Sequence, residues 1–444
     1  MAKVNVVTKE TVGIIKPMHA VNNGPIVARG DQTRGNEKAY KAARIPYARN
    51  HDASFNAAYG GEHTVDIYAI FPNFDADPYD PASYDFDITD HYCKEIQDAG
   101  TKVYYRLGSK IEHTIKKYNI WPPKDYQKWA IICEHIIAHY TEGWANGFHW
   151  DIEYWEIWNE PDLDGDDAPI EWHRCWCGTA KEFYKFFRVA ATHLKKRFPN
   201  LKIGGPAIAR PSNSVWIDGF FKALTEDGER VPLDFFSWHI YSLDPHEMEL
   251  YCHKMREVLD KYGYTETESI LNEWNYVRGW TDEFVYSVLA IIGAKGAAFN
   301  AAAMAVCQNT PLDMLMYYDA RPSAFNGLFE FYTLRPLKGY WPFYIFADLY
   351  ELKNQVKGES DDPDVYVVAS ANEENARIMI SYFAENDESP EKEVSLSVDL
   401  SGEYTCYLTD ESNTMEKTTV SLTAGKAHKF TLKPQSMLYL EMVK

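Results

Sequence analysis

The stretch that decides the fold is Tyr154–Asp162, which reads YWEIWNEPD. It is a short apolar and aromatic run that ends in a carboxylate, Glu160, just before a proline. A second stretch, Ser269–Asn275 (SILNEWN), has the same design and leads into Glu273. A pair of carboxyl groups presented by two strands is the minimum set for cleaving a glycosidic bond. We therefore take Glu160 and Glu273 as candidate catalytic residues.

Short β-branched and aromatic runs alternate with longer helical patterns through most of the chain. This alternation is typical of successive βα units around a parallel sheet, and eight strands close a (β/α)8 barrel. The predicted strands are Gly13–His19, Ile45–Asn50, Lys102–Leu107, Tyr154–Asn159, Leu201–Ala207, Phe235–Ile240, Ser269–Asn272 and Leu312–Tyr318. The predicted helices include Ile88–Ala99, Phe183–Phe198 after the capping box Thr179-x-x-Glu182, Pro245–Tyr262 and Asp282–Gln308.

After about Ala347 the pattern changes to alternating strands separated by acidic turns. Seven strands are predicted there, and they are Val365–Ser370, Ala376–Phe383, Glu393–Val398, Gly402–Thr409, Thr418–Leu422, Lys429–Leu432 and Ser436–Met442. Such a series indicates an antiparallel β-sandwich. We therefore predict an α/β protein with a TIM barrel in residues 1–346 and a β-sandwich accessory domain in residues 347–444.

The composition narrows the class of partner. The formal charge is −20, with 45 Lys and Arg against 65 Asp and Glu, which disfavours binding to nucleic acid. No apolar run approaches the ~20 residues of a membrane span. A neutral oligosaccharide or glycoside suits this surface better. The sequence indicates no interface that would decide whether the protein forms a homo-oligomer.

The cysteines and the amino terminus give an expectation about the compartment. The seven cysteines are scattered and odd in number, which indicates reduced thiols and not a disulfide framework. The first ten residues lack the long apolar stretch of a secretory signal. We therefore expect a cytoplasmic protein, unless a signal peptide has been removed.

The two glutamates are expected to differ in protonation. In a parallel barrel the substrate meets the carboxyl ends of the strands, and Glu160 and Glu273 end the predicted strands four and seven. Each carboxylate disfavours ionisation of the other, so the less solvated one stays protonated at neutral pH. One glutamate would then act as the acid and the other as the nucleophile.

The residues around both glutamates resemble a known family. Trp158–Pro161 (WNEP) together with Asn272 and Glu273 resembles the clan A glycoside hydrolases. The opening Lys16–Pro25 (KPMHAVNNGP) and the appended sandwich are similar to glycoside hydrolase family 39, which includes β-xylosidases and α-L-iduronidases. The resemblance implies a retaining double displacement, with Glu273 as nucleophile, Glu160 as acid and base, and carboxyl groups about 5 to 5.5 Å apart.

The resemblance also implies roles for three neighbours of the glutamates. Asn159 would hydrogen-bond the sugar 2-hydroxyl, although an amide that fixes a loop is the alternative. Tyr241 would donate a hydrogen bond to Glu273, and His239 would line the same floor. A histidine and a tyrosine in an apolar strand are otherwise usually satisfied core groups. Trp274, which directly follows Glu273, is a further candidate for substrate binding.

Further candidates lie at the ends of the predicted strands one and two. Arg49, His51 and Asp52 end strand two, where the histidine and the aspartate could bind sugar hydroxyls. Arg49 could act near the nucleophile or equally tie strands together. His19 ends the predicted strand one and is a candidate for the glycone pocket.

Strand eight departs from what a plain β-xylosidase would offer there, a tryptophan followed shortly by a glutamate. It is followed instead by Asp319 and Arg321, either of which could contact a distal hydroxyl, and Arg321 would suit an anionic group.

Two metal-like patterns do not fit their sites. Asp162–Asp167 (DLDGDD) has a glycine at the fourth place and no glutamate at the twelfth, so it fails as a calcium loop. Cys175 and Cys177 with His173 lack the second pair of ligands that a zinc site needs. We therefore predict no metal and no cofactor.

Three functions remain open from the sequence. The first is an exo-acting retaining glycosidase, with a β-xyloside as the leading substrate. The second is an endo-acting polysaccharide hydrolase, in which the loops Ala53–Tyr84 and Asp162–Gly178 would leave an open groove. The third is a non-catalytic carbohydrate-binding barrel, which has no need of two opposed glutamates.

Overall fold

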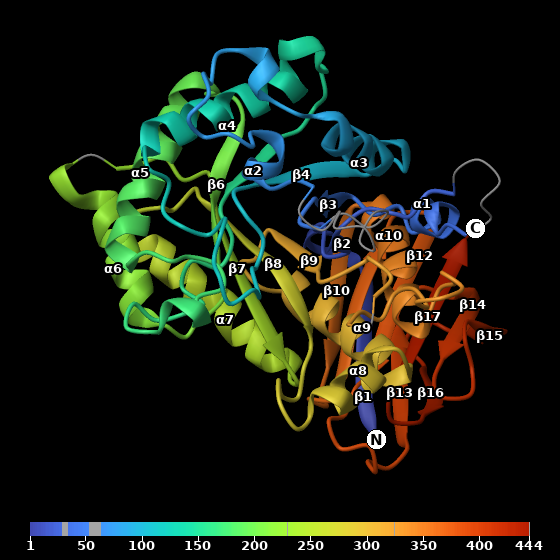
Figure 1. The fold of residues 1–444 in the computed structure, drawn as a ribbon. Helices are drawn as coiled ribbons and strands as arrows, with labels where there is room; N and C mark the ends of the chain where they lie inside the picture. Colours follow the sequence, from blue (N-terminus) through green and yellow to red (C-terminus); the bar gives the residue numbers. More distant parts are fainter. Residues whose placement is uncertain (29–33, 53–63, 229, 324, 444) are drawn as a thin grey trace.

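The computed structural model describes residues 1–28, 34–52, 64–228, 230–323 and 325–443. It contains a closed eight-stranded parallel barrel and, beside it, a nine-stranded sheet (Figure 1). The barrel strands, in order around the barrel, are β2 (Ala20–Asn22), β3 (Tyr47–Arg49), β4 (Lys102–Leu107), β5 (Tyr154–Ile157), β6 (Lys202–Ile208), β7 (Phe235–Ser242), β8 (Glu268–Tyr276) and β9 (Met314–Tyr317). The predicted TIM barrel is confirmed.

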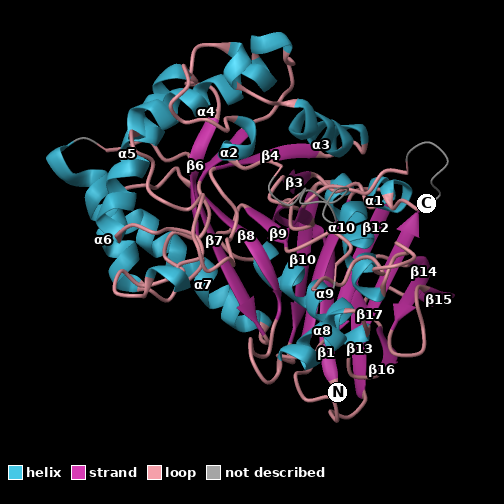
Figure 2. Cartoon of the chain, in the orientation of Figure 1, coloured by secondary structure: helices cyan, strands magenta, loops and turns pink. Residues whose placement is uncertain are grey.

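Helices follow the barrel strands and cover the outside of the barrel (Figure 2). They are α1 (Glu37–Ala42), α2 (Ile67–Ile70), α3 (Asp87–Asp98), α4 (Tyr126–Thr141), α5 (Ala180–Arg197), α6 (Ser214–Thr225), α7 (Pro245–Lys261), α8 (Phe284–Ile291), α9 (Ala294–Gln308) and α10 (Trp341–Leu352). The predicted capping box is present, since the Thr179 hydroxyl accepts from the Glu182 N–H and the Glu182 carboxylate accepts from the Thr179 N–H. The predicted helix Asp282–Gln308 is instead two helices.

Apolar side chains fill the amino-terminal half of the barrel. They come from the first residues of the strands, and they are Ala20, Tyr104, Tyr154, Phe235, Ile270, Met314 and Met316. A larger apolar layer packs the outer faces of the strands against the helices. The substrate site of a parallel barrel lies at the carboxyl ends of its strands, so the polar side chains at that end are the ones of functional interest.

The second sheet has the order β15-β14-β17-β12-β11-β10-β1-β13-β16. Its strands are β1 (Ala2–Ile14), β10 (Asn354–Ser360), β11 (Val365–Ala371), β12 (Asn375–Tyr382), β13 (Lys392–Val398), β14 (Gly402–Thr409), β15 (Glu416–Leu422), β16 (Ala427–Leu432) and β17 (Ser436–Val443). Apolar residues of all nine strands converge in one core, so the sheet folds over itself. All seven predicted strands are present within two residues of their predicted ends. The sheet is mixed and not purely antiparallel, because β1 pairs with β13 in parallel.

The amino terminus corrects two predictions. β1 pairs with β10 and β13, so the first strand of the chain lies in the second sheet and not in the barrel (Figure 1). The predicted first barrel strand, Gly13–His19, is therefore wrong, and the barrel begins at Ala20. The assignment of all of residues 1–346 to the barrel fails for the same strand, and its end point falls inside α10. Ala2, Val4 and Val6 alternate with exposed residues, which is the pattern of a half-buried strand.

α9 lies between the two parts of the molecule. It is buried along its whole length and contacts α7 on one side and β11, β12 and β17 on the other. A helix that is buried all round carries apolar residues on every face. Within the described residues no single helix has the length and apolar character of a membrane span. The α8–α9 pair meets that test only when joined, and it bends by 81° at its break.

Candidate active site

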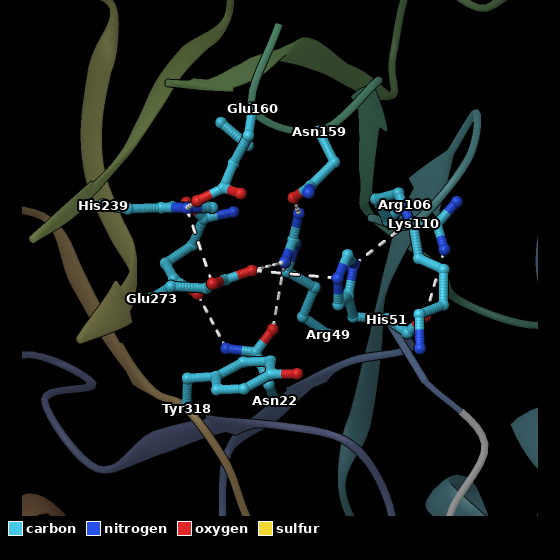
Figure 3. A network of polar contacts seen from close by, with 12 residues as sticks. Asn22, Arg49, His51, Arg106, Lys110, Asn159, Glu160, His239, Glu273 and Tyr318 are labelled. Atoms are coloured by element: carbon cyan, nitrogen blue, oxygen red, sulfur yellow. Dashed lines mark hydrogen bonds and ion pairs between the residues drawn. The ribbon is translucent and has the colours of Figure 1, made fainter. Parts of the chain in front are cut away.

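Glu160 and Glu273 meet at the carboxyl ends of β5 and β8, as predicted (Figure 3). One ligand-type atom from each of Glu160, His239 and Glu273 lies within 4.8 Å of the other two. The backbone turns sharply after β5, since Trp158 and Glu160 have φ values of 77° and 47°. These left-handed conformations are uncommon outside glycine and often mark functional sites. The turn places the Glu160 carboxyl beside its partner.

Glu273 is held by donors on both of its oxygens. Arg49 Nη1 donates to Oε1 at 2.7 Å, and the Tyr241 hydroxyl donates to Oε2 at 2.9 Å. His239 Nδ1 lies 3.5 Å from Oε2. Burial raises the pKa of Glu273 above its usual value, and His239, Arg49 and Tyr241 counter that rise. These contacts fix the orientation of the carboxyl group and stabilise its anion.

Glu160 has weaker partners. His239 Nδ1 is 2.9 Å from Oε1, and Cys175 Sγ is 3.8 Å from Oε2. Burial raises the pKa of Glu160 to about 7, although the charges of Arg49 and Arg174 act to lower it. Burial also lowers the pKa of His239 to about 4, so this imidazole is neutral at neutral pH. Glu160 is thus suited to hold a proton near neutral pH and to release it.

Arg49 connects the catalytic pair to the barrel. Its guanidinium is fully buried and donates to Glu156 at 2.6 Å, to Asn159 Oδ1 at 2.7 Å and to Asn22 Oδ1 at 3.1 Å, in addition to Glu273. Arg49 therefore has both roles that the sequence left open, since it binds the nucleophile candidate and also ties strands together. Because Asn159 Oδ1 faces Arg49, its Nδ2 is the atom that can donate to a sugar hydroxyl.

Glu156 lies at the floor of this network and pairs with Arg49. Tyr104, Ser237 and Asn272 donate to its Oε1 at 3.2, 2.6 and 2.6 Å, while Arg49 binds Oε2. Its side chain is fully buried and satisfied on both oxygens. This carboxylate is structural, since every donor comes from the barrel itself.

His51 faces the same oxygen of Glu273 as Arg49. Arg106 Nε donates to His51 Nδ1 at 3.2 Å, and Arg106 in turn binds Asp66 at 2.6 Å. Burial, together with Arg49 and Arg106, lowers the pKa of His51 well below its usual value. A neutral ring that accepts at Nδ1 carries its proton on Nε2, which lies 3.9 Å from Glu273 Oε1. His51 can therefore donate to a sugar hydroxyl bound beside Glu273.

A charged cluster lies behind His51. Asp52 is fully buried and contacts Lys110 Nζ at 2.8 Å, the Tyr318 hydroxyl at 2.9 Å and Arg321 at 3.6 Å. Although burial opposes ionisation, Arg321 and Lys110 hold the pKa of Asp52 well below its usual value. This cluster offers fixed donors and acceptors of both signs.

Asp319 extends the charged cluster toward β2. Asn23 Nδ2 donates to its Oδ2 at 2.6 Å, and Arg321 Nε lies 3.4 Å from the same oxygen. Burial raises the pKa of Asp319 to about 7. Three predicted site residues, Asp52, Asp319 and Arg321, are thus brought together next to the nucleophile candidate.

Two predicted site residues lie elsewhere. His19 precedes β2 and packs its ring against Phe346 and Tyr350 of α10, with centroids 5.5 and 5.2 Å apart, so it is not part of the glycone pocket. Trp274 is fully buried and packs against Phe299 of α9 and Tyr317, so its indole faces the barrel wall and not the substrate. Both predictions fail because the side-chain direction depends on where each strand begins and bends.

Several residues of the site were not predicted as site residues from the sequence. They are Asn22, Asn23, Arg106, Lys110 and Tyr318. Asn22 and Asn23 lie at the end of β2, the first strand of the barrel. Had β2 been predicted as the first barrel strand, both residues would have been candidates. Lys110 follows β4 by three residues, where a polar side chain is also a signal.

Residues of the two metal-like sequence patterns are bound by other groups of the protein. Asp164 binds Arg174 at 2.7 Å, and Asp166 accepts from the Ala180 N–H at the start of α5. Both ring nitrogens of His173 face backbone carbonyl oxygens, at 2.7 and 3.0 Å. All seven cysteines are buried and unpaired.

The chain matches a known family over most of its length. A profile for glycosyl hydrolases family 39 matches residues 66–409. The chain belongs to this family. The match covers the barrel from β4 onward and strands β10 to β14 of the second sheet, and it includes both glutamates and their partners on β7.

Individual relatives agree with the family 39 assignment. A β-xylosidase from Caldicellulosiruptor saccharolyticus is 34% identical over 155 residues, which are 34% of this chain and 27% of that protein. The chain thus matches only about a quarter of that relative. A glucosidase structure from Croceicoccus marinus superposes with a TM-score of 0.81 at 22% identity, covering 100% of this chain and 99% of the other. A monomeric β-xylosidase structure from Caulobacter crescentus superposes with a TM-score of 0.70 at 14% identity, covering 99% of both chains. At these identities the structures show a shared fold.

Proposed function

We propose that this family 39 protein is an exo-acting retaining glycosidase, with a β-xyloside as the leading substrate. The β-xylosidase relative supports the choice of sugar. The main support is the pair of opposed glutamates, whose nearest carboxyl oxygens lie within 4.8 Å of each other. Glu273 is held by Arg49 and Tyr241, whereas Glu160 has a pKa of about 7. Inverting enzymes need roughly 6.5 to 9.5 Å between their carboxyl groups to admit a water, whereas retaining enzymes need about 5 to 5.5 Å.

The proposed reaction has two steps. Glu273 attacks the anomeric carbon as the glycosidic bond breaks, and Glu160 gives its proton to the departing oxygen. Glu160, now a carboxylate, takes a proton from water, and the resulting hydroxide attacks the anomeric carbon and releases Glu273. Asn159 Nδ2 donates to the sugar 2-hydroxyl, a contact that strengthens as positive charge develops on the ring.

The charged cluster supports exo action. Asp52 and Asp319 are fully buried, and the side chains of Lys110 and Arg321 are only 10% and 15% exposed. These four side chains occupy the space behind His51, on the Glu273 side of the pocket. A chain continuing past the terminal sugar in that direction would have to displace paired charges, which is costly when they are buried. A single sugar residue therefore fits best.

Replacement of the nucleophile tests the proposal. Glu273→Gln is expected to lower kcat for aryl glycosides on the order of 10⁴-fold or more, because the amide cannot form the glycosyl-enzyme ester. The measurement is turnover on a panel of aryl xyloside, glucoside, galactoside, arabinoside and iduronide. Glu268→Gln, at the opposite end of the same strand and bound to Lys202, is the matched control. Near-normal turnover of Glu273→Gln on the substrates that the wild type cleaves would overturn the assignment.

A further inference from the structure

A surface cavity lies beside the loop that follows Glu160. Its volume is about 520 Å³, within the range of small-molecule sites. The residues that line it come from the loops after β4 and β5, and they are His113, Lys117, Asp164, Glu171, Trp172 and Arg174. None of these residues takes part in the proposed double displacement.

The cavity adjoins the acid and not the nucleophile. The Leu163 N–H donates to the Glu160 carbonyl at 3.1 Å, and Cys175, next to Arg174, contacts the Glu160 carboxyl. The charges of Arg174 and Asp164 both act on the Glu160 carboxyl. The charged cluster around Asp52, in contrast, lies beside Glu273. The pocket therefore has two sides, and the cavity is on the Glu160 side.

Hydrogen bonds within the protein hold three of the lining residues, Asp164, Arg174 and Lys117. Asp164 accepts from Arg174 Nη2 at 2.7 Å and from the Arg174 N–H at 2.7 Å, which ties the two ends of the loop together. Lys117 Nζ donates to the carbonyl oxygens of Glu112 and Thr114. The Glu112 N–H donates to the Arg174 carbonyl at 2.7 Å, joining the loops after β4 and β5. Side chains held in this way lose less freedom when a ligand binds, which lowers the entropic cost of binding.

The chemistry of the lining suits a sugar ring. The side chain of Trp172 is 67% exposed, so one large aromatic surface is available to the apolar face of a ring. Lys117 and Arg174 balance Asp164 and Glu171 in formal charge, so the cavity favours no net charge on its ligand. Fixed donors and acceptors around one aromatic platform are what a polyhydroxylated neutral molecule requires.

We propose that this cavity is a binding site for the leaving group and that its ligand is a sugar residue, stacked on Trp172. The inference rests on the proposed function, since Glu160 must face the oxygen that it protonates and the leaving group therefore extends to the Glu160 side. The natural substrate is then an oligosaccharide, from which the enzyme releases one terminal sugar, and not the glycoside of a small alcohol.

The test compares substrates that differ only in the leaving group. A glycosyl fluoride of the preferred sugar has no ring to place in the cavity, whereas a β-linked di- or trisaccharide of that sugar fills it. Trp172→Ala is expected to lower kcat/KM for the oligosaccharides by about tenfold, chiefly through KM, and to leave the fluoride within about twofold. Trp172→Phe is expected to lie between the two. Tyr79→Ala, a similarly exposed ring packed on α4, is the control.

The outcomes separate the two proposals. If the wild type cleaves no glycosyl fluoride or glycoside of the panel, the proposed function fails and the leaving-group site fails with it. If the wild type is active but Trp172→Ala cleaves oligosaccharides normally, only the leaving-group site is wrong. An equal loss on the fluoride and the oligosaccharides would assign Trp172 to folding, and would likewise overturn the site.

Discussion

Arg49 joins two buried carboxyl groups of the barrel through one cation. One guanidinium pairs with both Glu156 and Glu273 and reaches two asparagine oxygens, so most of its fixed donors are used. Two buried carboxylates without it would each lose a direct cation, and breaking a buried pair costs about 3–5 kcal/mol. The nucleophile candidate is therefore inseparable from the structural framework of the barrel.

Protonation of Glu160 makes the reaction dependent on pH. Its pKa of about 7 means that the acid form, which step one requires, is lost as the pH rises above 7. We expect kcat/KM for an unactivated glycoside to fall about tenfold per pH unit on the basic side of this value. The measurement is the pH profile of kcat/KM for the wild type and Glu160→Gln.

Glu160→Gln is expected to remove that basic limb and to slow cleavage of an unactivated glycoside by about 10²–10⁴-fold. A dinitrophenyl glycoside needs no proton on its leaving group, so the glycosylation of Glu273 from this substrate should be nearly unchanged. A basic limb that persists in Glu160→Gln would assign the pKa near 7 to another group, such as Asp162 or Asp319.

At the scale of single residues the sequence indicated the catalytic pair but not every neighbour. Glu160 and Glu273 could be predicted because each follows an apolar run in the sequence, although β8 continues past Glu273 to Tyr276. The direction of Trp274 could not be, because the pairing of β8 with β9 shifts between Leu271 and Trp274, and such a bulge redirects the side chains after it. A comparable shift lies between Trp238 and His239 on β7.

Among the secondary structure elements, the two strands at the amino terminus, β1 and β2, were not predicted. β2 has only three residues, and the longer apolar run Gly13–His19 just before it contains Pro17, which cannot donate to a ladder. β1 was missed as a strand of the second sheet because its partners, β10 and β13, are more than 300 residues away in the sequence. The seven strands of that sheet after β10 were predicted, since each is a short strand-like run that a turn separates from the next.

The buried position of His19, just before β2, predicts that the protein loses stability as the pH falls. Burial lowers the pKa of His19 from 6.5 to about 3, so the unfolded chain binds one more proton between these values. The contribution to stability is complete above pH 6.5 and is lost as the pH falls, by about 1.4 kcal/mol per pH unit at most. His19→Phe is expected to reduce the fall in Tm between pH 7 and pH 4.5.

Thermal unfolding of both proteins across this pH range measures the effect of His19. The aromatic contacts with Phe346 and Tyr350 are available to either ring, so the two proteins should differ least at pH 7 and most at pH 4.5. Parallel curves for the two proteins would show that His19 is not the group that titrates.

In the molecule as a whole, the second sheet supports the strand that carries Glu273. Glu385, in the turn after β12, accepts from the Tyr276 hydroxyl at 2.9 Å and from Arg278 Nε at 2.7 Å. Lys295 Nζ on α9 lies 3.3 Å from the same carboxylate. Tyr276 ends β8, three residues after Glu273, so one carboxylate of the second sheet fixes the end of the nucleophile strand.

Glu385→Ala should therefore affect both stability and substrate binding. Trp280, just beyond Arg278, packs against Tyr241 at 5.0 Å, and Tyr241 donates to Glu273, so loosening residues 276–280 would disturb the glycone side of the pocket. We expect the free energy of unfolding to fall by about 1–3 kcal/mol and KM to rise several-fold, with a smaller change in kcat. Chemical unfolding and steady-state kinetics on the preferred aryl glycoside measure the two effects. Glu388→Ala, an exposed position in the same turn, is the control. A loss of stability with unchanged KM would mean that the second sheet holds the barrel together without shaping its pocket.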